Sequence, residues 1–471
     1  MKKLNKQHTV DQRYPEKVIQ FGEGNFMRGF VDWQLQQMNQ QGLFQGSAVV
    51  VQPIAQGLGE MLAEQDYLYT VLLDGILNDQ VINSAEIVST VNRVINPYDD
   101  YQSYLDLALD DQLSVIISNT TEAGIQFLAD DSLSNQPPTS FPGKLTALLA
   151  RRFDLKKAGF TIIPCELIDR NGEKLKEIVL QYAEQWGLGA DFRTWLQTEN
   201  TFCCSLVDRI VPGYPREDQE ELQSRLGYRD QLMVKAEPFL LWVIEGPASL
   251  KDQLPLAKAG LNVVVTDDMT PYRERKVHLL NGPHTAMVPL GLLAGLETVE
   301  DVMLDEDFSQ FVDQLMAEEI IPVLDLPQSE LISYANSVKE RFKNPFIRHE
   351  LTAIALNSLS KFKARLLPLL VNYQKQQHTL PPLMTLALAG LITFYRGDYP
   401  LQDDQHVLDT FAEAWQRPET VVPAIFSNHS LWEQDLSQLP GLVEAVEADL
   451  SLLEKGSRAA LQTKLRGESY A

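Results

Sequence analysis

Residues 18–30 read Val-Ile-Gln-Phe-Gly-Glu-Gly-Asn-Phe-Met-Arg-Gly-Phe, an apolar run that leads into three glycines. The apolar run predicts a short buried strand, and the residues after it suit a helix packed on a sheet. Glycine lacks the Cβ that would keep a pyrophosphate away from the loop amides, and the start of a helix favours negative charge. The segment therefore predicts a dinucleotide-binding turn, although its spacing Gly-x-Gly-x-x-x-x-Gly brings the third glycine late.

Strand-like and helical patterns alternate through the first half of the chain. The predicted strands are 18–21, 48–51, 113–118, 160–164 and 263–266, and the predicted helices are 26–39, 101–109, 144–153 and 173–186. Such alternation is typical of a mostly parallel sheet with helices on both faces.

Helical patterns dominate after residue 267, at 273–280, 308–319, 351–370, 383–394 and 442–465. The fold class that we predict is therefore α/β, with a Rossmann-like NAD-binding domain followed by a mainly α-helical domain for substrate and catalysis. We place the boundary so that the domains cover 1–266 and 267–471.

The second predicted strand ends at Gln52. A dinucleotide fold usually presents Asp or Glu there to the adenosine ribose of NAD. Glutamine can bond a ribose hydroxyl, but it does not repel a 2′-phosphate as a carboxylate would. This position therefore leaves the choice between NAD and NADP open.

A second motif, Lys-Val-His-Leu-Leu-Asn-Gly-Pro-His, occupies 276–284. On a regular helix Asn281 and His284 would lie about 140° and about 80° from Lys276. Carbonyl reduction needs a proton donor such as the lysine and a neutral donor such as the amide. The alternative is a helix with three scattered polar residues. Pro283 predicts a kink within the segment.

Composition narrows the class of protein. The chain has 471 residues, 44% hydrophobic content and a net charge of −24, which argues against nucleic acid or an anionic membrane as a partner. No apolar run approaches the ~18 residues of a membrane span, and the first residues lack a signal-peptide core. Three cysteines without a C-x-x-C pair predict neither disulfides nor a metal site, and we expect a cytoplasmic location.

One window is basic within this acidic chain. Six basic residues lie between positions 341 and 365 against one acid, Glu350. Arg and Lys suit carboxylates, so the window is a candidate anion site. The alternative is a basic helix face that is paired with acidic neighbours.

Several further segments accompany these motifs, namely Ser-Asn-Thr-Thr-Glu-Ala-Gly at 118–124, Val-Asp-Arg at 207–209, Thr-Pro-Tyr at 270–272 and Arg-Phe-Lys-Asn-Pro at 341–345. Together with the glycine turn and the Lys–Asn–His motif they resemble the polyol-specific long-chain dehydrogenases, the mannitol dehydrogenase family. The resemblance spans nearly the whole chain.

The resemblance implies NAD-dependent hydride transfer without zinc. Lys276 would exchange the substrate proton, Asn281 would stabilise the oxyanion and His284 would help to hold the substrate. The implied cofactor-binding residues are Phe21, Gly22, Gly24, Asn25, Phe26, Arg28, Gln52, Asn119, Thr120 and Glu122, and the implied substrate-binding residues are Arg273, Lys361 and Arg365. A base at position 276 also requires a lysine pKa below its usual value of about 10.4.

Within the family, the segments 20–26, 118–125, 163–169, 320–327 and 393–397 resemble those of the enzymes that interconvert the sugar acids tagaturonate and altronate, and the resemblance implies this reaction. The alternatives are the sister reaction on fructuronate and mannonate, a polyol dehydrogenase, and a dinucleotide-binding sensor without turnover. The chain departs from the mannitol dehydrogenases at Leu167, where they carry an oxyanion-binding Asn, and Asn171 is a candidate replacement. The sequence leaves the oligomeric state open.

Overall fold

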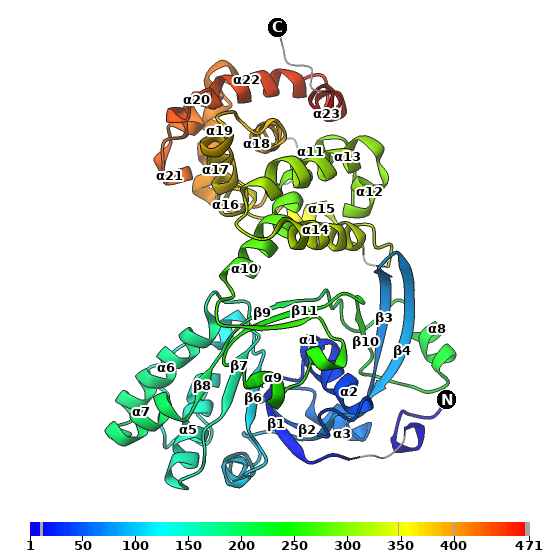
Figure 1. Ribbon diagram of the computed structural model, residues 1–471, viewed down its shortest axis with the longest axis vertical. Helices are drawn as coiled ribbons and strands as arrows, with labels where there is room; N and C mark the ends of the chain where they lie inside the picture. Colours follow the sequence, from blue (N-terminus) through cyan, green and yellow to red (C-terminus); the bar gives the residue numbers. More distant parts are fainter. Residues whose placement is uncertain (10–12, 347, 398, 400, 467–471) are drawn as a thin grey trace. The chain divides into compact units, whose positions relative to one another are not determined.

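The computed structural model describes residues 1–9, 13–346, 348–397, 399 and 401–466. The chain divides into two compact units, which Figure 1 shows as a sheet-containing part and a helical part. The first unit comprises Met1–Asp74 and Val81–Met269, and the second comprises Gly75–Gln80 and Thr270–Ala471. The predicted α/β class, with a Rossmann-like domain before a mainly helical one, is confirmed. The boundary after residue 266 remains our proposal for where two folding domains meet.

A six-stranded parallel sheet forms the centre of the first unit (Figure 1). Its order is β5-β2-β1-β6-β7-β8. The strands are β1 Glu16–Phe21, β2 Ser47–Val51, β5 Val91–Ile95, β6 Val115–Ser118, β7 Thr161–Pro164 and β8 Thr201–Phe202. Continuous apolar runs suit such strands because helices cover both faces of a parallel sheet. The predicted strands 18–21, 48–51, 113–118 and 160–164 are confirmed to within two residues at each end.

Alternate residues of β1 enter different hydrophobic cores. Val18 packs with Phe30 and Leu35 on one face, whereas Ile19 packs with Leu145 and other residues on the opposite face. The first face is covered by the helical run of α1 Asn25–Met27, η2 Arg28–Asp32 and α2 Trp33–Gln40, and the second by α4 Tyr101–Asp106, α5 Phe141–Asp154 and α6 Asn171–Gln185. These helices match the four that the sequence predicts in this half.

Two small sheets, which the sequence analysis largely missed, complete the first unit. One has the order β10-β3-β4 and the other β12-β11-β9. Their strands are β3 Tyr69–Leu77, β4 Gln80–Val88, β9 Cys204–Asp208, β10 Val234–Ala236, β11 Leu241–Glu245 and β12 Val263–Thr266, of which only the last was predicted. The tip of the β3–β4 hairpin belongs to the second unit, where the N–H groups of Asn78 and Asp79 donate to the Glu340 carboxylate.

The second unit is built around two buried helices. These are α11 Gly282–Leu293 and α18 Pro382–Phe394, which pack against each other. Around them lie α10 Thr270–Lys276, η6 Val277–Asn281, α12 Val299–Leu304, α13 Glu306–Gln314, η7 Leu315–Ile320, α14 Gln328–Phe342, α15 Leu351–Ile354, α16 Ser358–Arg365, α17 Leu367–Gln377, α19 Gln405–Ala414, α20 Val421–Phe426, α22 Leu442–Leu453 and α23 Ser457–Leu465.

Two of the predicted long helices are wrong in extent. The predicted helix 351–370 is three helices, because Asn357 adopts a left-handed conformation with φ 54° and a further break falls at Leu366. The predicted helix 442–465 is likewise interrupted at Gly456, whose φ is 105°. Asn357 and Gly456 each lie directly before the next helix, and their positive φ prevents one regular helix from running through; asparagine and glycine adopt this conformation more readily than other residues.

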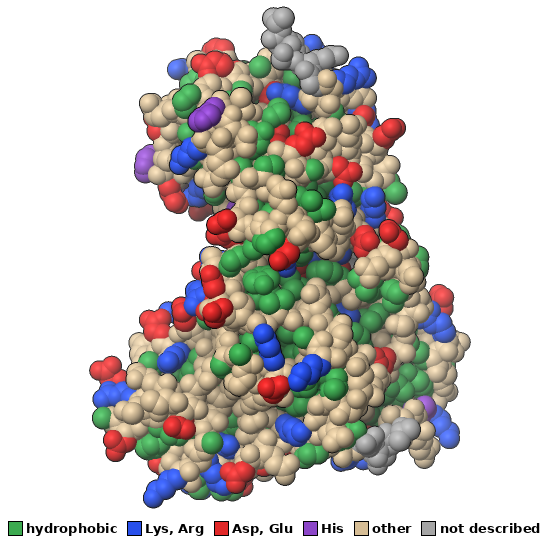
Figure 2. Space-filling model, viewed as in Figure 1, with side chains coloured by type: hydrophobic (Ala, Val, Ile, Leu, Met, Phe, Trp, Pro, Cys, Tyr) green, Lys and Arg blue, Asp and Glu red, His purple; other side chains and the backbone are tan. Residues whose placement is uncertain are grey.

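On the face that Figure 2 shows, acidic and basic side chains are interspersed over both units. Among the described residues, no helix is long and apolar enough to cross a bilayer.

A buried carboxylate caps α18. Glu319 accepts hydrogen bonds from the N–H groups of Leu383 (2.6 Å) and Met384 (2.8 Å), and the start of a helix favours this negative charge. Burial nevertheless raises the pKa of Glu319 to about 7.

This raised pKa makes the stability of the second unit pH-dependent. An unfolded glutamate titrates near 4.3, so between about pH 4.3 and about pH 7 the folded protein holds a proton that the unfolded chain releases. The free energy of unfolding should therefore fall as the pH rises through this window. We expect Glu319→Gln to remove up to about 4 kcal/mol of that fall, at about 1.4 kcal/mol per pKa unit. Urea denaturation at about pH 5 and about pH 8 measures it. The exposed neighbour Glu318 provides the control, since Glu318→Gln should keep the slope; equal slopes in both variants would contradict the assignment.

Candidate functional site

The glycine turn follows β1 directly, and its first glycine is dictated by space. Gly22 has φ 109°, and a Cβ there would lie 2.6 Å from the carbonyl oxygen of Asn119, which follows β6. Gly24 differs, because it has φ −67° and a Cβ there would meet no atom within 4 Å. Gly22 is therefore required by the protein itself, whereas the open space at Gly24 is available to a ligand.

The late third glycine has a packing role. A Cβ on Gly29 would lie 3.0 Å from a methyl group of Val234 and 3.1 Å from one of Val211. The Gly29 carbonyl also accepts a hydrogen bond from the buried guanidinium of Arg209 (2.8 Å). Gly29 thus brings the helical run close to its neighbours, as the last glycine of a dinucleotide turn does.

Buried polar side chains form a hydrogen-bond network next to the glycine turn. Gln20 donates from Nε2 to the Gly22 carbonyl (3.0 Å) and to the Asp32 carboxylate (3.4 Å). Tyr69 donates its hydroxyl to the same carboxylate (2.6 Å), and burial raises the pKa of Asp32 to about 6. The sequence analysis missed Gln20, Asp32 and Tyr69. Their signal is weak, because a polar residue in a predicted buried strand or helix indicates only that a partner exists.

The two predicted aromatic residues of the turn pack against other rings, Phe21 fully and Phe26 partly buried. The Phe21 ring is buried and packs on Phe141, with centroids 4.8 Å apart, and Phe26 stacks on Phe30 at the same distance. Because the Phe21 ring is buried, only the backbone of this residue can face a ligand.

Arg28 and Asn25 bond to each other. The buried Arg28 guanidinium donates to the Asn25 side-chain oxygen (2.7 Å) and to the Leu232 carbonyl (3.0 Å). These contacts order the first turn of the helical run. Direct contact of either side chain with a cofactor stays a prediction.

The loop after β6 is held by a residue that the sequence analysis passed over. Buried Glu166 accepts from the Thr120 N–H (2.8 Å) and hydroxyl (3.0 Å) and from the Ser118 hydroxyl (3.0 Å). Burial raises the pKa of Glu166. Thr121 follows with φ 71°, which strains a β-branched residue and is typical of functional loops. The predicted side chain of Glu122 lies outside the described part of the structure.

The two loops meet where the strand order reverses. β2 lies on one side of β1 and β6 on the other, so the turn at Gly22 and the loop at Asn119 lie at the carboxyl ends of adjacent strands. In open α/β sheets this switch point is where ligands bind. Gln52 lies nearby at the end of β2, and its side-chain oxygen accepts from the Gly59 N–H (3.1 Å).

The Lys–Asn–His motif lies in the second unit, and its helix is irregular. Lys276 ends α10, Asn281 ends the π-helical turn η6, and His284 lies in the first turn of α11. The predicted angles of about 140° and about 80° assume a regular α-helix. They do not apply, because a π turn separates Lys276 from Asn281. Pro283 is the second residue of α11 and follows the π turn directly, so the irregularity of the helical run lies just before the proline.

His284 has the most unusual environment of the three. It is 8% exposed, its ring lies 4.3 Å from Phe342 and 5.0 Å from His349 between centroids, and within the described residues its Nε2 has no hydrogen-bond partner. Burial lowers the pKa of His284 well below its usual value. Nearby basic groups lower it further, and they are His349, Arg341, Arg365 and Lys361.

Two predicted substrate residues thus belong to the His284 cluster. Lys361 donates to the Ile354 carbonyl (2.7 Å), and Arg365 donates to the Thr285 hydroxyl (3.2 Å). Burial lowers the pKa of both, and Arg365 lowers that of Lys361 further. The third predicted residue, Arg273, lies half-buried on α10, and its role stays a prediction.

The cluster also contains basic residues that the predicted site omitted. Arg341 is buried at the end of α14, and half-buried His349 stacks edge-on against His284. Both fall inside or beside the basic window of the sequence, which was the available signal. What the sequence could not show is that the window folds back onto the histidine.

Asn171 does not supply the missing oxyanion donor. It is fully buried, and its amide nitrogen donates to the carbonyls of Pro164, Glu166 and Ser205, each at 3.0 Å. Leu167, in the place of the family's Asn, is 64% exposed. The Asn171 alternative is therefore wrong, because no donor remains on that amide.

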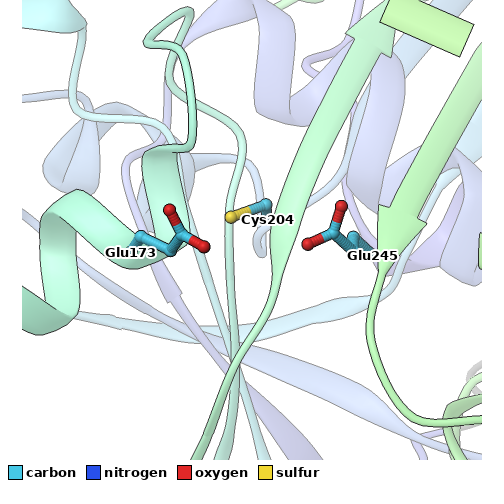
Figure 3. Close-up of side chains that lie close together, drawn as sticks. All are labelled: Glu173, Cys204 and Glu245. Carbon is cyan, nitrogen blue, oxygen red and sulfur yellow. The ribbon is translucent and has the colours of Figure 1, made fainter. Parts of the chain in front are cut away.

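Within the described ranges, one group of side chains has the spacing of metal ligands. Glu173, Cys204 and Glu245 converge in Figure 3, with ligand atoms within 4.8 Å of one another. Arg170 binds the carboxylates of both glutamates, and Glu245 also accepts from the Met269 N–H (2.9 Å). This is an ion-pair network in which the Arg170 guanidinium bridges the two carboxylates and balances one of their two negative charges. All three cysteines of the chain are buried and free of disulfides.

Comparisons with known proteins agree along the whole chain. The mannitol dehydrogenase Rossmann domain matches residues 16–258, and the mannitol dehydrogenase C-terminal domain matches residues 268–454. An altronate oxidoreductase of Escherichia coli O7:K1 is 46% identical over 98% of this chain and 99% of its own length. That of Shigella flexneri is 47% identical with the same coverage.

Solved structures share the fold. Pseudomonas fluorescens mannitol 2-dehydrogenase, in a ternary complex with NAD and D-mannitol, has a TM-score of 0.70 at 22% identity over 99% of this chain and all of its own. A D-sorbitol dehydrogenase in substrate-free form has a TM-score of 0.82 at 21% identity over 98% of this chain and all of its own. From its glycine turn to its C-terminal helices, the chain belongs to the mannitol dehydrogenase family of oxidoreductases.

Proposed function

We propose that the protein reversibly interconverts D-tagaturonate and D-altronate, with NAD as its cofactor. The altronate oxidoreductases at 46% and 47% identity over nearly the full length support this substrate pair. The observation that carries the proposal is the cluster of basic groups around buried His284 in a chain of net charge −24. A neutral polyol would give no reason to gather these charges, whereas the carboxylate of a sugar acid would.

The residues of the glycine turn fit a nicotinamide dinucleotide. The space that a side chain at Gly24 would occupy is open, and the amides after it begin a helical run that extends from Asn25 to Gln40. Such a helix start attracts the negative charge of a pyrophosphate. When bound, the cofactor donates or accepts a hydride. NAD rather than NADP is our proposal, supported by the family resemblance.

The second unit would handle the substrate. In the reductive direction the Lys276 ammonium donates a proton to the carbonyl oxygen while the carbonyl carbon takes up the hydride. Asn281, a neutral donor, stabilises the negative charge that develops on this oxygen. Because its pKa is lowered so far, His284 is uncharged near neutrality and binds the substrate as a hydrogen-bonding group. Lys361 and Arg365 hold the substrate carboxylate through charge-assisted hydrogen bonds.

The alternatives differ in what they need from these residues. The sister reaction on fructuronate needs the same cluster, because the two substrates differ only in stereochemistry. A polyol dehydrogenase would not need the basic groups, and a sensor without turnover would not need Lys276. We further propose a cytoplasmic location, supported by three thiols that are free in the fold.

One panel of assays tests the assignment. NADH oxidation is followed with tagaturonate, fructuronate and fructose, each repeated with NADPH. We expect tagaturonate with NADH to give the highest kcat/KM. Faster turnover of fructuronate would assign the sister reaction, and faster turnover of fructose would remove the role given to the basic cluster.

Gly24→Val should weaken NADH binding in a folded protein. The backbone of Gly24, with φ −67° and ψ 173°, suits valine, and the new side chain would meet no protein atom. It would instead fill the space that we assign to the pyrophosphate. Fluorescence titration measures the dissociation constant of NADH. Gly29→Ala is the contrasting variant, since a Cβ there is crowded and should lower the melting temperature. Unchanged NADH affinity in Gly24→Val would move the pyrophosphate elsewhere.

Lys276→Ala should lower kcat by about 10²- to 10⁴-fold, the usual contribution of an acid–base group. NADH affinity should stay nearly intact, because the lysine acts on the substrate proton. Steady-state kinetics and NADH titration separate the two effects. Lys363→Ala is the matched control, since Lys363 pairs with Glu433 in the same unit and should be dispensable. A Lys276→Ala variant with near-normal kcat would exclude this lysine from the mechanism.

Lys361→Met should raise KM for tagaturonate by roughly ten- to a hundredfold, because it removes a contact worth about 1.5–3 kcal/mol while keeping the side-chain length. The effect should shrink for a neutral keto-sugar, and NADH affinity should not change. The exposed Lys343 serves as the control, and Lys343→Met should leave KM unchanged. Equal losses with charged and neutral substrates would assign Lys361 to structure, through its bond to the Ile354 carbonyl.

A further inference from the structure

The carboxylate that is missing from the end of β2 is supplied from another part of the chain. We propose that Glu23, between the first two glycines of the turn, determines the choice of NAD over NADP by repelling a 2′-phosphate. The inference rests on the proposed function, because it concerns the cofactor of the same site. It makes Glu23 a specificity-determining residue that acts through its charge.

The position of Glu23 is the first support. Its Oε1 accepts a hydrogen bond from the Leu58 N–H (3.1 Å), in the loop that follows β2. A Cβ placed on Gly57 of that loop would lie 2.1 Å from Glu23 Oε1 and 2.8 Å from Gln52 Nε2. The carboxylate and the Gln52 amide therefore flank the same glycine, at the strand end where a dinucleotide fold places the adenosine ribose.

The charge of Glu23 is only partly compensated, which is the second support. The residue is 6% exposed, and its buried Oε2 has no hydrogen-bond partner among the residues that the structure describes. Burial raises the pKa of Glu23, while the Leu58 N–H and the charge of Arg28 act in the opposite direction. Arg28 donates to Asn25 and to the Leu232 carbonyl, which are neutral acceptors, so its charge offsets part of the charge of Glu23. A carboxylate in such surroundings is little screened, so its field extends to a group bound nearby.

Space for such a group exists beside Gln52. A hollow of about 710 Å³ is lined by Gln52, Gly57 and Gly59, by Arg93 from β5, and by the acidic residues Glu60, Asp99 and Asp100. Glu23 does not line this hollow itself, and its carboxylate reaches the loop at Gly57. Arg93 would be the natural ligand for a 2′-phosphate, but its Nε and Nη2 bind the Glu16 carboxylate, at 2.9 Å and 2.8 Å. The charge of this arginine is thus balanced by Glu16.

A purely structural role for Glu23 is the competing explanation, since its bond to the Leu58 N–H links the turn to the loop after β2. Charge and structure are separable by substitution. Glu23→Gln keeps an oxygen acceptor for the Leu58 N–H and removes the charge, whereas Glu23→Asp keeps the charge and shortens the side chain.

The proposal is tested by measuring the dissociation constants of NADH and NADPH for the wild type and both variants by fluorescence titration. The ratio of the two constants is compared among the three proteins. The wild type should favour NADH. Glu23→Gln should tighten NADPH binding at least about tenfold relative to NADH, because like charges a few ångströms apart at a dielectric constant of about 20 repel by more than the 1.4 kcal/mol of a tenfold change. Glu23→Asp should retain the discrimination. Glu86→Gln, which removes a half-buried carboxylate bonded to Trp33, is the control and should leave the ratio unchanged.

An unchanged NADPH-to-NADH ratio in folded Glu23→Gln would overturn the inference while leaving the proposed function intact. If that variant does not fold, Glu23→Asp decides, because loss of discrimination with the charge retained also overturns it. A wild type that binds neither nucleotide would instead overturn the proposed cofactor.

Discussion

The contact between Gly22 and the Asn119 carbonyl is the constraint on which the nucleotide end of the molecule depends. It brings the turn after β1 against the loop after β6, and any side chain at position 22 would force them apart. Around this contact the chain has placed buried polar groups whose partners hold each loop in place, Gln20 and Asp32 for the first and Glu166 for the second. Each buried group requires its partners, so an error in one loop would leave unpaired polar atoms in the interior.

How far the sequence predicts this fold depends on whether a signal is local. The strand before Gly22 and the helical run after it are predictable, because a buried parallel strand is apolar throughout and Gly22 has a positive φ that favours glycine. The contacts of Gly22 with Asn119 and of Gly29 with Val211 and Val234 join distant parts of the chain and are not predictable in this way. The β3–β4 hairpin is not, since β4 is mostly exposed and Val81 is 68% exposed, so no apolar pattern distinguishes it. The π turn after Lys276 cannot be predicted either, because no pattern of residue types marks it. Angles between side chains that are calculated for a regular α-helix do not hold across this turn.

The same distinction holds for the candidate site. Lys276, Asn281 and His284 stand out because they are close together in one motif, and their roles rest on that motif. The grouping of His284 with Arg341 and His349 joins residues that are 57 and 65 positions apart in the chain, and no local rule joins them. The basic window could be found from composition. Whether its residues form an anion site or a helix face paired with acids could not, and the structure shows both kinds of residue in the window. Arg348 and Lys363 do pair with exposed acids, whereas Lys361 and Arg365 lie by the histidine.

The three cysteines have a practical consequence. Cys165, Cys203 and Cys204 are all buried, and burial raises the pKa of each thiol, so little thiolate forms near neutrality. The native chain should react slowly with maleimides and be resistant to mild oxidants. A pair of cysteines introduced on the surface, one in each unit, would then carry spectroscopic labels without removing any native residue. The protein is thus already suited to site-specific labelling at chosen surface positions.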